Sequence, residues 1–286
     1  MEFRTIVDIP DPGFRIAPCE AMLFVGSCFA DKMGARFTEE RFRTTVNPFG
    51  VMYNPASVLH TIERLSTLHT QHSSLNTQHS TLNTIQTAFL TLGTNHVYRL
   101  KETGEIVDNC QKRPQALFQE EQLTVDACAD YLQRAIDLLL AANPQMRVVI
   151  TVSPIRYRKY GYHGSQLSKA TLLLAVDNVV SKAQSSKFNV TYFPAYEIVN
   201  DELRDYRFYA EDMLHPSAQA VAYIWERFSE VYLSDDAKAF LKEWQPLKAA
   251  LQHKPFDPDS QEYRQFMDKT MLKIAALQKK YPNFAC

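Results

Sequence analysis

The sequence contains no long run of hydrophobic residues. No window approaches the roughly 18 consecutive apolar residues from which a membrane-spanning helix is built. The first residues, Met1-Glu2-Phe3-Arg4-Thr5, include an acid and no continuous apolar core of signal-peptide length. We therefore expect neither a membrane span nor an export signal.

Paired cysteines and an excess of charge are also missing. The 5 cysteines are odd in number and include no C-x-x-C pair, which argues against a disulfide framework and a zinc ribbon and favours a reducing, cytoplasmic location. The formal net charge is -1, and Lys and Arg form no cluster. Because nucleic-acid binders usually carry a clear basic excess, we expect no nucleic-acid partner.

The composition that remains is that of an ordinary globular protein. Of 286 residues, 45% are hydrophobic and 22% are charged, which allows one substantial core and is unlike a disordered chain. We expect an α/β domain over residues 1–233 and a helical extension over residues 234–286 that packs on it.

The stretch from Leu23 to Ala30 is the most informative part of the chain. An apolar run predicts a buried strand, Gly26-Ser27 predicts a turn, and residues 29–41 follow with helical periodicity. Gly26 permits a close backbone approach, and Ser27 lies at a helix N-terminus, where negative charge is favoured. This position suits a nucleophilic serine, and it suits a helix cap equally well.

Strands alternate with helices along most of the chain. This pattern predicts a parallel sheet covered on both faces, with ligands at the carboxyl ends of its strands. The region 97–100 is expected to be an edge strand, and residues 108–122 are expected to be irregular. Further strands are expected at 44–46, 88–92, 147–152 and 189–193, and further helices at about 56–65, 125–142, 166–183 and 217–233.

A tandem repeat interrupts this pattern. Residues 70–76 read Thr-Gln-His-Ser-Ser-Leu-Asn and are almost repeated at 77–83. Two polar copies are too few for a solenoid, so we predict an inserted surface loop or a fraying helix over about residues 67–86. His69, His72 and His79 do not indicate a metal site, because a repeat spaces residues regularly without any ligand-binding purpose.

Residues suited to nucleophilic catalysis occur in several separate segments. A serine nucleophile needs a base, an acid that orients the base, and donors for the oxyanion. His215 is the candidate base, and Asp212, three residues earlier, can accept its imidazole N–H. The candidate oxyanion donors are the backbone N–H groups of Ser27 and Gly50 and the side-chain amide of Asn95.

Other polar residues are candidates for binding the substrate. We expect Asn47 and Lys112 to bind the substrate. Arg156 is the best candidate for binding an anionic or polar group of the substrate. The alternative for Arg156 is a salt bridge to an acid in the region 201–205. We expect the aromatic residues at 206–209 to form core beneath the catalytic loop rather than a sugar-stacking platform.

Several motifs resemble those of a known family. Besides Gly26-Ser27-Cys28-Phe29-Ala30, they lie within residues 22–233 and read Asn47-Pro48-Phe49-Gly50, Asn54-Pro55, Val152-Ser153-Pro154-Ile155-Arg156, Ser168-Lys169-Ala170 and the stretch from Asp201 to Pro216. Together they resemble the GSCFA family, which is named after the first string and is similar to the wider SGNH (GDSL-like) hydrolase superfamily.

The resemblance implies a fold and an activity. The implied fold is a three-layer αβα sandwich with a mostly parallel, flavodoxin-like sheet. The implied roles are nucleophile for Ser27, oxyanion hole for Gly50 and Asn95, and base for His215, with Asp212 in its usual place. The implied reaction is hydrolysis or transfer of an acyl group from a small-molecule or glycan ester, without a cofactor. Acetylated carbohydrate is one candidate substrate.

The sequence also departs from the family pattern. His96 follows Asn95 where the superfamily carries Asp, and Gln111 stands where family members carry His. These departures motivate an alternative, a non-catalytic module that binds a ligand in the same cleft. A cysteine nucleophile at Cys28 is disfavoured, because the side chain after Ser27 on a helix points elsewhere. The sequence does not indicate an oligomeric state.

Overall fold

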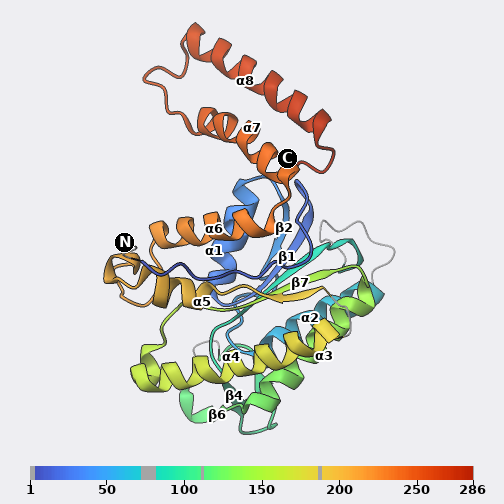
Figure 1. Cartoon of the computed structure of the whole chain (residues 1–286), viewed down its shortest axis with the longest axis vertical. Helices are drawn as coiled ribbons and strands as arrows, with labels where there is room; N and C mark the ends of the chain where they lie inside the picture. The colour runs from blue at the N-terminus through green and yellow to red at the C-terminus, as the bar shows by residue number, and fades with distance from the viewer. Residues whose placement is uncertain (1–3, 72–81, 111–112, 186–188, 286) are drawn as a thin grey trace.

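The computed structural model describes residues 4–71, 82–110, 113–185 and 189–285. Its centre is a sheet of five strands that run parallel to one another, as predicted, in the order β2-β1-β3-β7-β8 (Figure 1). Because all five strands run in the same direction, their carboxyl ends lie along one edge. The strands are β1 (Ala21–Gly26), β2 (Arg43–Val46), β3 (Thr87–Leu92), β7 (Arg147–Val152) and β8 (Val190–Tyr192).

Helices cover both faces of this sheet and give the three predicted layers (Figure 1). Met22 and Phe24 of β1 pack into a core rich in aromatic residues, beneath α1 (Cys28–Glu39) and α6 (Ala218–Tyr232). Leu23 and Val25 point to the opposite, mainly aliphatic core. This second core is covered by α2 (Pro55–Gln71), α3 (Val125–Ala142) and α4 (Gly161–Ser185).

A second, antiparallel sheet follows β3. It consists of β4 (His96–Leu100), β5 (Ile106–Val107) and β6 (Phe118–Gln122) in the order β5-β4-β6. Because β4 is the central strand of this sheet, the prediction that residues 97–100 form an edge strand is wrong. The prediction that residues 108–122 are irregular is wrong for β6. Phe118 is the one buried residue of β6, so this polar edge strand lacks the apolar alternation by which strands are recognised.

The last helices, α7 (Asp235–Gln252) and α8 (Gln261–Lys280), extend beyond the end of α1 (Figure 1). Buried Trp244 of α7 donates its indole N–H to the carbonyl oxygen of Glu39 at 3.1 Å. Lys248 pairs with Glu39 and Glu40, each at 2.9 Å. The short helical segments are η1 (Leu82–Thr84), η2 (Gln115–Leu117), η3 (Arg158–Tyr160), α5 (Ala195–Glu197), η4 (Ile198–Leu203) and η5 (Tyr206–Phe208).

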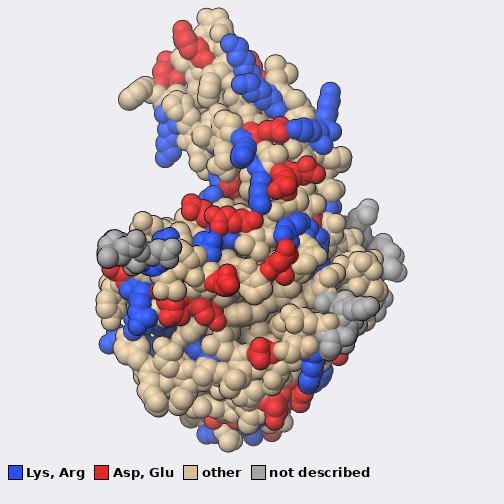
Figure 2. Space-filling model, viewed as in Figure 1, with Lys and Arg blue, Asp and Glu red and all other residues tan. Residues whose placement is uncertain are grey.

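Residues 72–81, which contain most of the tandem repeat, and Lys112 lie outside the described residues. Across the face shown in Figure 2, side chains of Lys and Arg are interspersed with those of Asp and Glu. Within the described ranges, no helix combines the length and the apolar character needed to cross a bilayer.

Candidate active site

Ser27 lies in the turn between β1 and α1. Its side-chain oxygen accepts the Phe29 N–H at 3.3 Å and caps α1, so the capping role is present. Gly26 has φ of 140°, and a Cβ there would overlap the carbonyl oxygen of Thr91. The sequence therefore needs glycine at position 26 to bring Ser27 against β3. Ser27 has no exposed surface.

Asn47 holds this turn in place. Its side-chain oxygen accepts the Gly26 N–H at 2.9 Å, and its amide donates to the carboxylate of Asp31 on α1 at 2.6 Å. Further along the same loop, the Met52 N–H donates to the carbonyl oxygen of Gly26 at 2.8 Å. Asn47, predicted to bind substrate, thus anchors the loop that carries Gly50 over the end of β1.

The predicted oxyanion donors already take part in hydrogen bonds. The Ser27 N–H donates to the carbonyl oxygen of Thr91 at 3.1 Å, and the Gly50 N–H donates to that of Asn47 at 2.8 Å. The Asn95 amide donates to the carbonyl oxygen of Leu123 at 2.7 Å. A primary amide has two N–H donors, and this bond uses one of those of Asn95.

Asp212 and His215 form a tightly bonded pair just before α6. The His215 imidazole Nδ1 lies 2.6 Å from one carboxylate oxygen of Asp212, and the other oxygen accepts the N–H groups of Leu214 and His215. Hydrogen bonds from the backbone N–H of His215, the backbone N–H of Leu214 and the His215 side chain lower the pKa of Asp212 to about 2. Asp212 is therefore a carboxylate at neutral pH, and Nε2 of His215 faces away from it.

The pair sits at the same edge of the sheet as Ser27. Leu214 accepts the backbone N–H of Arg156, which follows β7, at 3.0 Å, and β3 lies between β7 and β1. His215 and Ser27 differ in exposure to solvent. The His215 side chain is 39% exposed, whereas Ser27 is buried. In the part of the chain that the structure describes, no hydrogen bond joins Ser27 to His215.

Arg156 secures the histidine loop. Its guanidinium donates to the carbonyl oxygen of Met213 at 3.1 Å and lies over the rings of Tyr162 and Tyr209, 4.2 and 5.2 Å from their centroids. The alternative salt bridge to region 201–205 is not formed among the described residues. Arg156 instead lines a cavity of about 270 Å³ together with Tyr209 and Tyr206. The expectation that region 206–209 is core is wrong for Tyr206, which is 70% exposed.

Two residues at the ends of β3 and β7 received no role from the sequence. Lys169 of α4 is fully buried and donates to the carbonyl oxygens of Gly93 and Ser153, each at 2.7 Å, at the ends of β3 and β7. Burial lowers its pKa to about 7. Lys169 lies on the apolar stripe of its helix with Leu172 and Val176, which was an available signal.

Tyr157 is the second such residue, and no sequence pattern marked it. Its ring meets Tyr53 edge to face, with centroids 6.1 Å apart. Its hydroxyl lies against Gly93, where an added Cβ would overlap it. The hydroxyl is buried and has no hydrogen-bond partner among the described residues.

Of the residues behind the alternative hypotheses, His96 and Cys28 have structural contacts, and Gln111 lies outside the described residues. His96 stacks on Tyr160 with ring centroids 3.6 Å apart, its Nδ1 lies 3.0 Å from Glu120, and burial lowers its pKa. His96 thus belongs to the small sheet. The Cys28 sulfur lies 3.9 Å from the Tyr53 hydroxyl. Among the residues placed, no group of three or more His, Cys, Asp or Glu could hold a metal ion.

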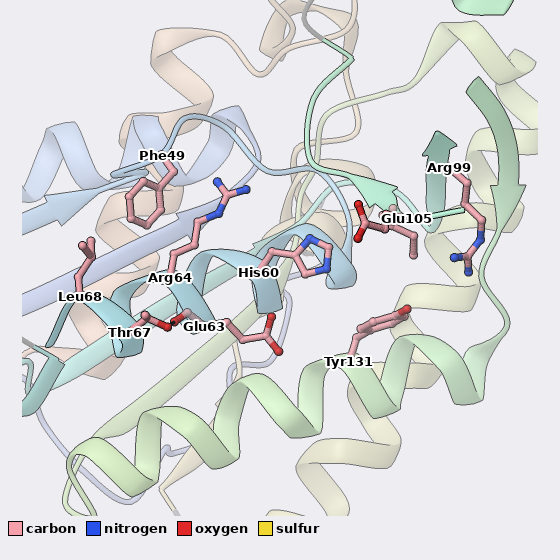
Figure 3. Close-up of a pocket in the computed structure, with 10 residues that line it drawn as sticks. Phe49, His60, Glu63, Arg64, Thr67, Leu68, Arg99, Glu105 and Tyr131 are labelled. Atoms are coloured by element: carbon pink, nitrogen blue, oxygen red, sulfur yellow. Dashed lines mark hydrogen bonds between the residues drawn. The ribbon is translucent and has the colours of Figure 1, made fainter. Parts of the chain in front are cut away.

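A larger cavity lies away from the serine. It has a volume of about 710 Å³ and lies between α2, α3 and the small sheet (Figure 3). Arg64 and His60 on its wall both pair with Asp108 at 2.7 Å. Phe49, which precedes Gly50 in the loop at the end of β1, also lines this cavity. Ser27, Asp212 and His215 do not line this cavity.

Solved structures to which this chain is similar include those of the following three ester hydrolases. A family 3 carbohydrate esterase from Clostridium thermocellum is 13% identical, with 78% of this chain and 99% of that chain covered and a TM-score of 0.41. A GDSL-like lipase from Bacteroides thetaiotaomicron is 12% identical, with 78% and 88% covered and a TM-score of 0.43. The acetylxylan esterase Axe2 from Geobacillus stearothermophilus, as a catalytic mutant, is 13% identical, with 77% and 98% covered and a TM-score of 0.42.

A search of curated proteins found no match. The family described as "GSCFA family" matches residues 21–72 and 65–228, which span the central sheet and the loop of His215. The "GSCFA domain protein, C-terminal domain" matches residues 244–286, from within α7 onward. These matches cover most of the chain, and the chain therefore belongs to the GSCFA family.

Proposed function

We propose that the protein is a serine hydrolase of carboxylic esters, acting as an esterase or an acyl transferase. The observation that carries this proposal is the oriented Asp212–His215 pair, held at the same sheet edge as Ser27. A serine at a helix N-terminus can act as the nucleophile of acyl transfer. An imidazole held in one tautomer by a carboxylate can act as its general base.

In the first half of the reaction, Ser27 becomes acylated. A lone pair of its side-chain oxygen attacks the ester carbonyl carbon, the C=O electron pair moves to the oxygen, and Nε2 of His215 takes the serine proton. When the tetrahedral intermediate collapses, the C–O bond to the alcohol breaks and His215 returns the proton to the leaving oxygen. Asp212, ionised throughout, stabilises the imidazolium.

In the second half, water or another alcohol repeats this sequence and releases the acyl group. The second amide N–H of Asn95 is an oxyanion donor in this proposal, and the Gly50 N–H joins it when the loop releases the carbonyl oxygen of Asn47. Because Ser27 is buried, the groups around it must move to admit a substrate, and Nε2 of His215 must come within hydrogen-bond reach of the Ser27 side-chain oxygen. Catalytic hydrogen bonds often tighten in this way only when ligand is bound.

For the substrate, we propose a class of ester rather than a single compound. Arg156, Tyr206 and Tyr209 border the histidine loop and offer a cation and aromatic faces to the polar part of an ester. Lys112 is retained as a second candidate cation. Acetylated carbohydrates fit these features and form one class in a test panel that also includes aryl and short-chain lipid esters.

A second candidate function is ligand binding without catalysis. It is favoured by the complete burial of Ser27 and by the internal hydrogen bonds of the Ser27 and Gly50 N–H groups. A binding module would hold an acylated ligand equally well in the wild type and in Ser27→Ala, and neither protein would turn it over.

Ser153 provides a matched control for the test. Like Ser27, it is buried at the end of a parallel strand, and its side-chain oxygen accepts the N–H two residues later at 3.3 Å. Ser27→Ala and Ser153→Ala therefore lose the same local contact. We expect Ser27→Ala alone to abolish hydrolysis of an aryl acetate, by a factor of at least about 10³. Equal activity of the two variants would refute the proposal.

A further inference from the structure

Most of the N–H groups predicted to bind the oxyanion are already used within the protein. The Ser27 and Gly50 N–H groups donate to carbonyl oxygens of the protein, and one N–H of Asn95 is also used. An oxyanion beside Ser27 usually needs more than one preorganised donor, and tyrosine hydroxyls can serve as such donors. A hydroxyl near the end of β3 that has no hydrogen-bond partner within the described ranges could supply a further donor.

The Tyr157 hydroxyl has this location. It lies against Gly93, two residues after Thr91, whose carbonyl oxygen accepts the Ser27 N–H. The carbonyl oxygen of Tyr53 also lies beside Gly93, because it accepts the Gly93 N–H at 2.8 Å. Gly93 thus leaves room for a phenol at the strand end that borders the nucleophile.

The position of the Tyr157 ring is fixed by the surrounding structure. The ring packs against Tyr53, and the backbone N–H of Tyr157 donates to the side-chain oxygen of Ser165 at 3.2 Å. Lys169, which bonds to the carbonyl oxygens of Gly93 and Ser153, places its Nζ 5.2 Å from the centroid of the Tyr157 ring. A donor fixed in advance pays little reorganisation cost during the reaction.

The hydroxyl is buried, yet nothing in the described part of the chain bonds to it. Buried polar groups are nearly always paired, so such an exception calls for an explanation such as a ligand or a bound water. Burial also raises the pKa of Tyr157 well above its usual range, which keeps the proton available for donation.

We propose that the Tyr157 hydroxyl donates a hydrogen bond to the oxyanion that forms when Ser27 attacks an ester carbonyl. This inference rests on the proposed esterase function and adds a catalytic residue to it. Tyr157 keeps its proton throughout, because the serine proton goes to His215, and it stabilises the oxygen that receives the carbonyl electron pair.

The test is the variant Tyr157→Phe, which retains the ring contact with Tyr53. Since the hydroxyl has no partner in the folded protein, we expect the midpoint of urea unfolding to stay the same or rise. For the ester that the wild type hydrolyses, we expect kcat to fall about 10²-fold while KM changes less than about twofold. Inhibition by phenylboronic acid, which forms a tetrahedral adduct on serine, should weaken by a similar factor.

Tyr232→Phe is the matched control. The Tyr232 hydroxyl is bonded to the side-chain oxygen of Thr191 at 3.3 Å and to the carbonyl oxygen of Tyr192 at 3.4 Å, in the aromatic core. Its loss should lower the unfolding midpoint and leave kcat unchanged, which is the opposite pattern to that of Tyr157→Phe.

The possible outcomes separate the two proposals. Ser27-dependent hydrolysis together with full activity of Tyr157→Phe would overturn the Tyr157 assignment alone and indicate that the hydroxyl binds only a water. A clear loss of stability in Tyr157→Phe would also overturn it, because the hydroxyl would then have a partner in the fold. Absence of Ser27-dependent turnover in the wild type would overturn both proposals.

Discussion

Asp212 is an exposed residue whose ionisation state is fixed by its contacts. The backbone N–H groups of His215 and Leu214 hold its pKa at about 2, and the imidazole of His215 completes the arrangement. The carboxylate charge is present above this pKa and is lost only as the pH falls through it. Changes in activity between pH 4 and pH 9 therefore do not report titration of Asp212.

Asp212→Asn is expected to lower kcat on the order of 10³–10⁴-fold, because the amide stabilises the wrong imidazole tautomer. Asp11→Asn is the control, since hydrogen bonds from the Arg15 side chain and the Gly13 N–H likewise lower the pKa of Asp11 to about 2, far from the site. Steady-state kinetics at pH 7 should show loss in the first variant alone. Equal rates in both would remove Asp212 from the mechanism.

Lys169 has a pKa in the folded protein of about 7, compared with 10.5 in its usual environment, because it is buried. Between these values the unfolded chain binds the proton and the folded protein does not. Below pH 7 the folded protein carries the full cost of a buried charge. Its stability therefore increases with pH across this window, by up to about 1.4 kcal/mol per pH unit.

The comparison variant is Lys169→Met, which does not titrate at this position. We expect the free energy of unfolding of the wild type, relative to the variant, to rise by about 2 kcal/mol between pH 7 and pH 9 in urea titrations. The difference between the two proteins removes the contribution of other titrating groups. If this difference in the free energy of unfolding did not change with pH, the pKa of Lys169 would be the same in the folded and unfolded protein, which would contradict the prediction.

At the scale of elements, the turn between β1 and α1 depends on one glycine. Gly26→Ala combines a positive φ with a collision against the backbone of Thr91, and it should cost about 3 kcal/mol or more. Gly13→Ala also has a positive φ, but its Cβ meets nothing within 4 Å, so it should cost about 1 kcal/mol. Urea unfolding tests both, and equal costs would show that the close approach to Thr91 is unimportant.

How far the sequence predicts an element depends on how much apolar surface that element buries. The near-continuous β-branched run of β7 and the periodic pattern of α3 were predicted at their observed bounds. The polar strand β6 was missed, because its pairing with β4 comes from backbone hydrogen bonds that side-chain patterns do not encode.

The same distinction applies to the candidate site. The residue types and the Asp212–His215 contact could be anticipated from local spacing. The internal partners of the Ser27 and Gly50 N–H groups and the unpaired Tyr157 hydroxyl could not, because they depend on how β3, β7 and the loop after β2 meet in space.

On the scale of the whole molecule, the C-terminal helices share a core with the central sheet. Trp244 and Phe240 of α7 belong to the same aromatic cluster as Phe37 of α1 and Trp225 of α6. Phe284, near the C-terminus, packs against Trp244, with ring centroids 5.4 Å apart. We therefore predict that residues 234–286 unfold together with the α/β domain.

The 2 tryptophans of the chain allow a direct test, since Trp225 lies in the domain and Trp244 in the extension. Trp225→Phe and Trp244→Phe each leave one fluorescent reporter. In both variants, the fluorescence transition in urea should coincide with the loss of circular dichroism at 222 nm. Separate transitions in either variant would mean that the extension folds independently.

The central claim is that Ser27 is the nucleophile of an ester hydrolase. The most direct measurement is mass spectrometry of the intact protein and its peptides after reaction with a fluorophosphonate, applied to the wild type, Ser27→Ala, His215→Ala and Ser153→Ala. We predict one adduct per chain, on Ser27, in the wild type and Ser153→Ala, and little or none in the other two. Folded wild type that remains unlabelled, or that is labelled at another residue, would contradict the account.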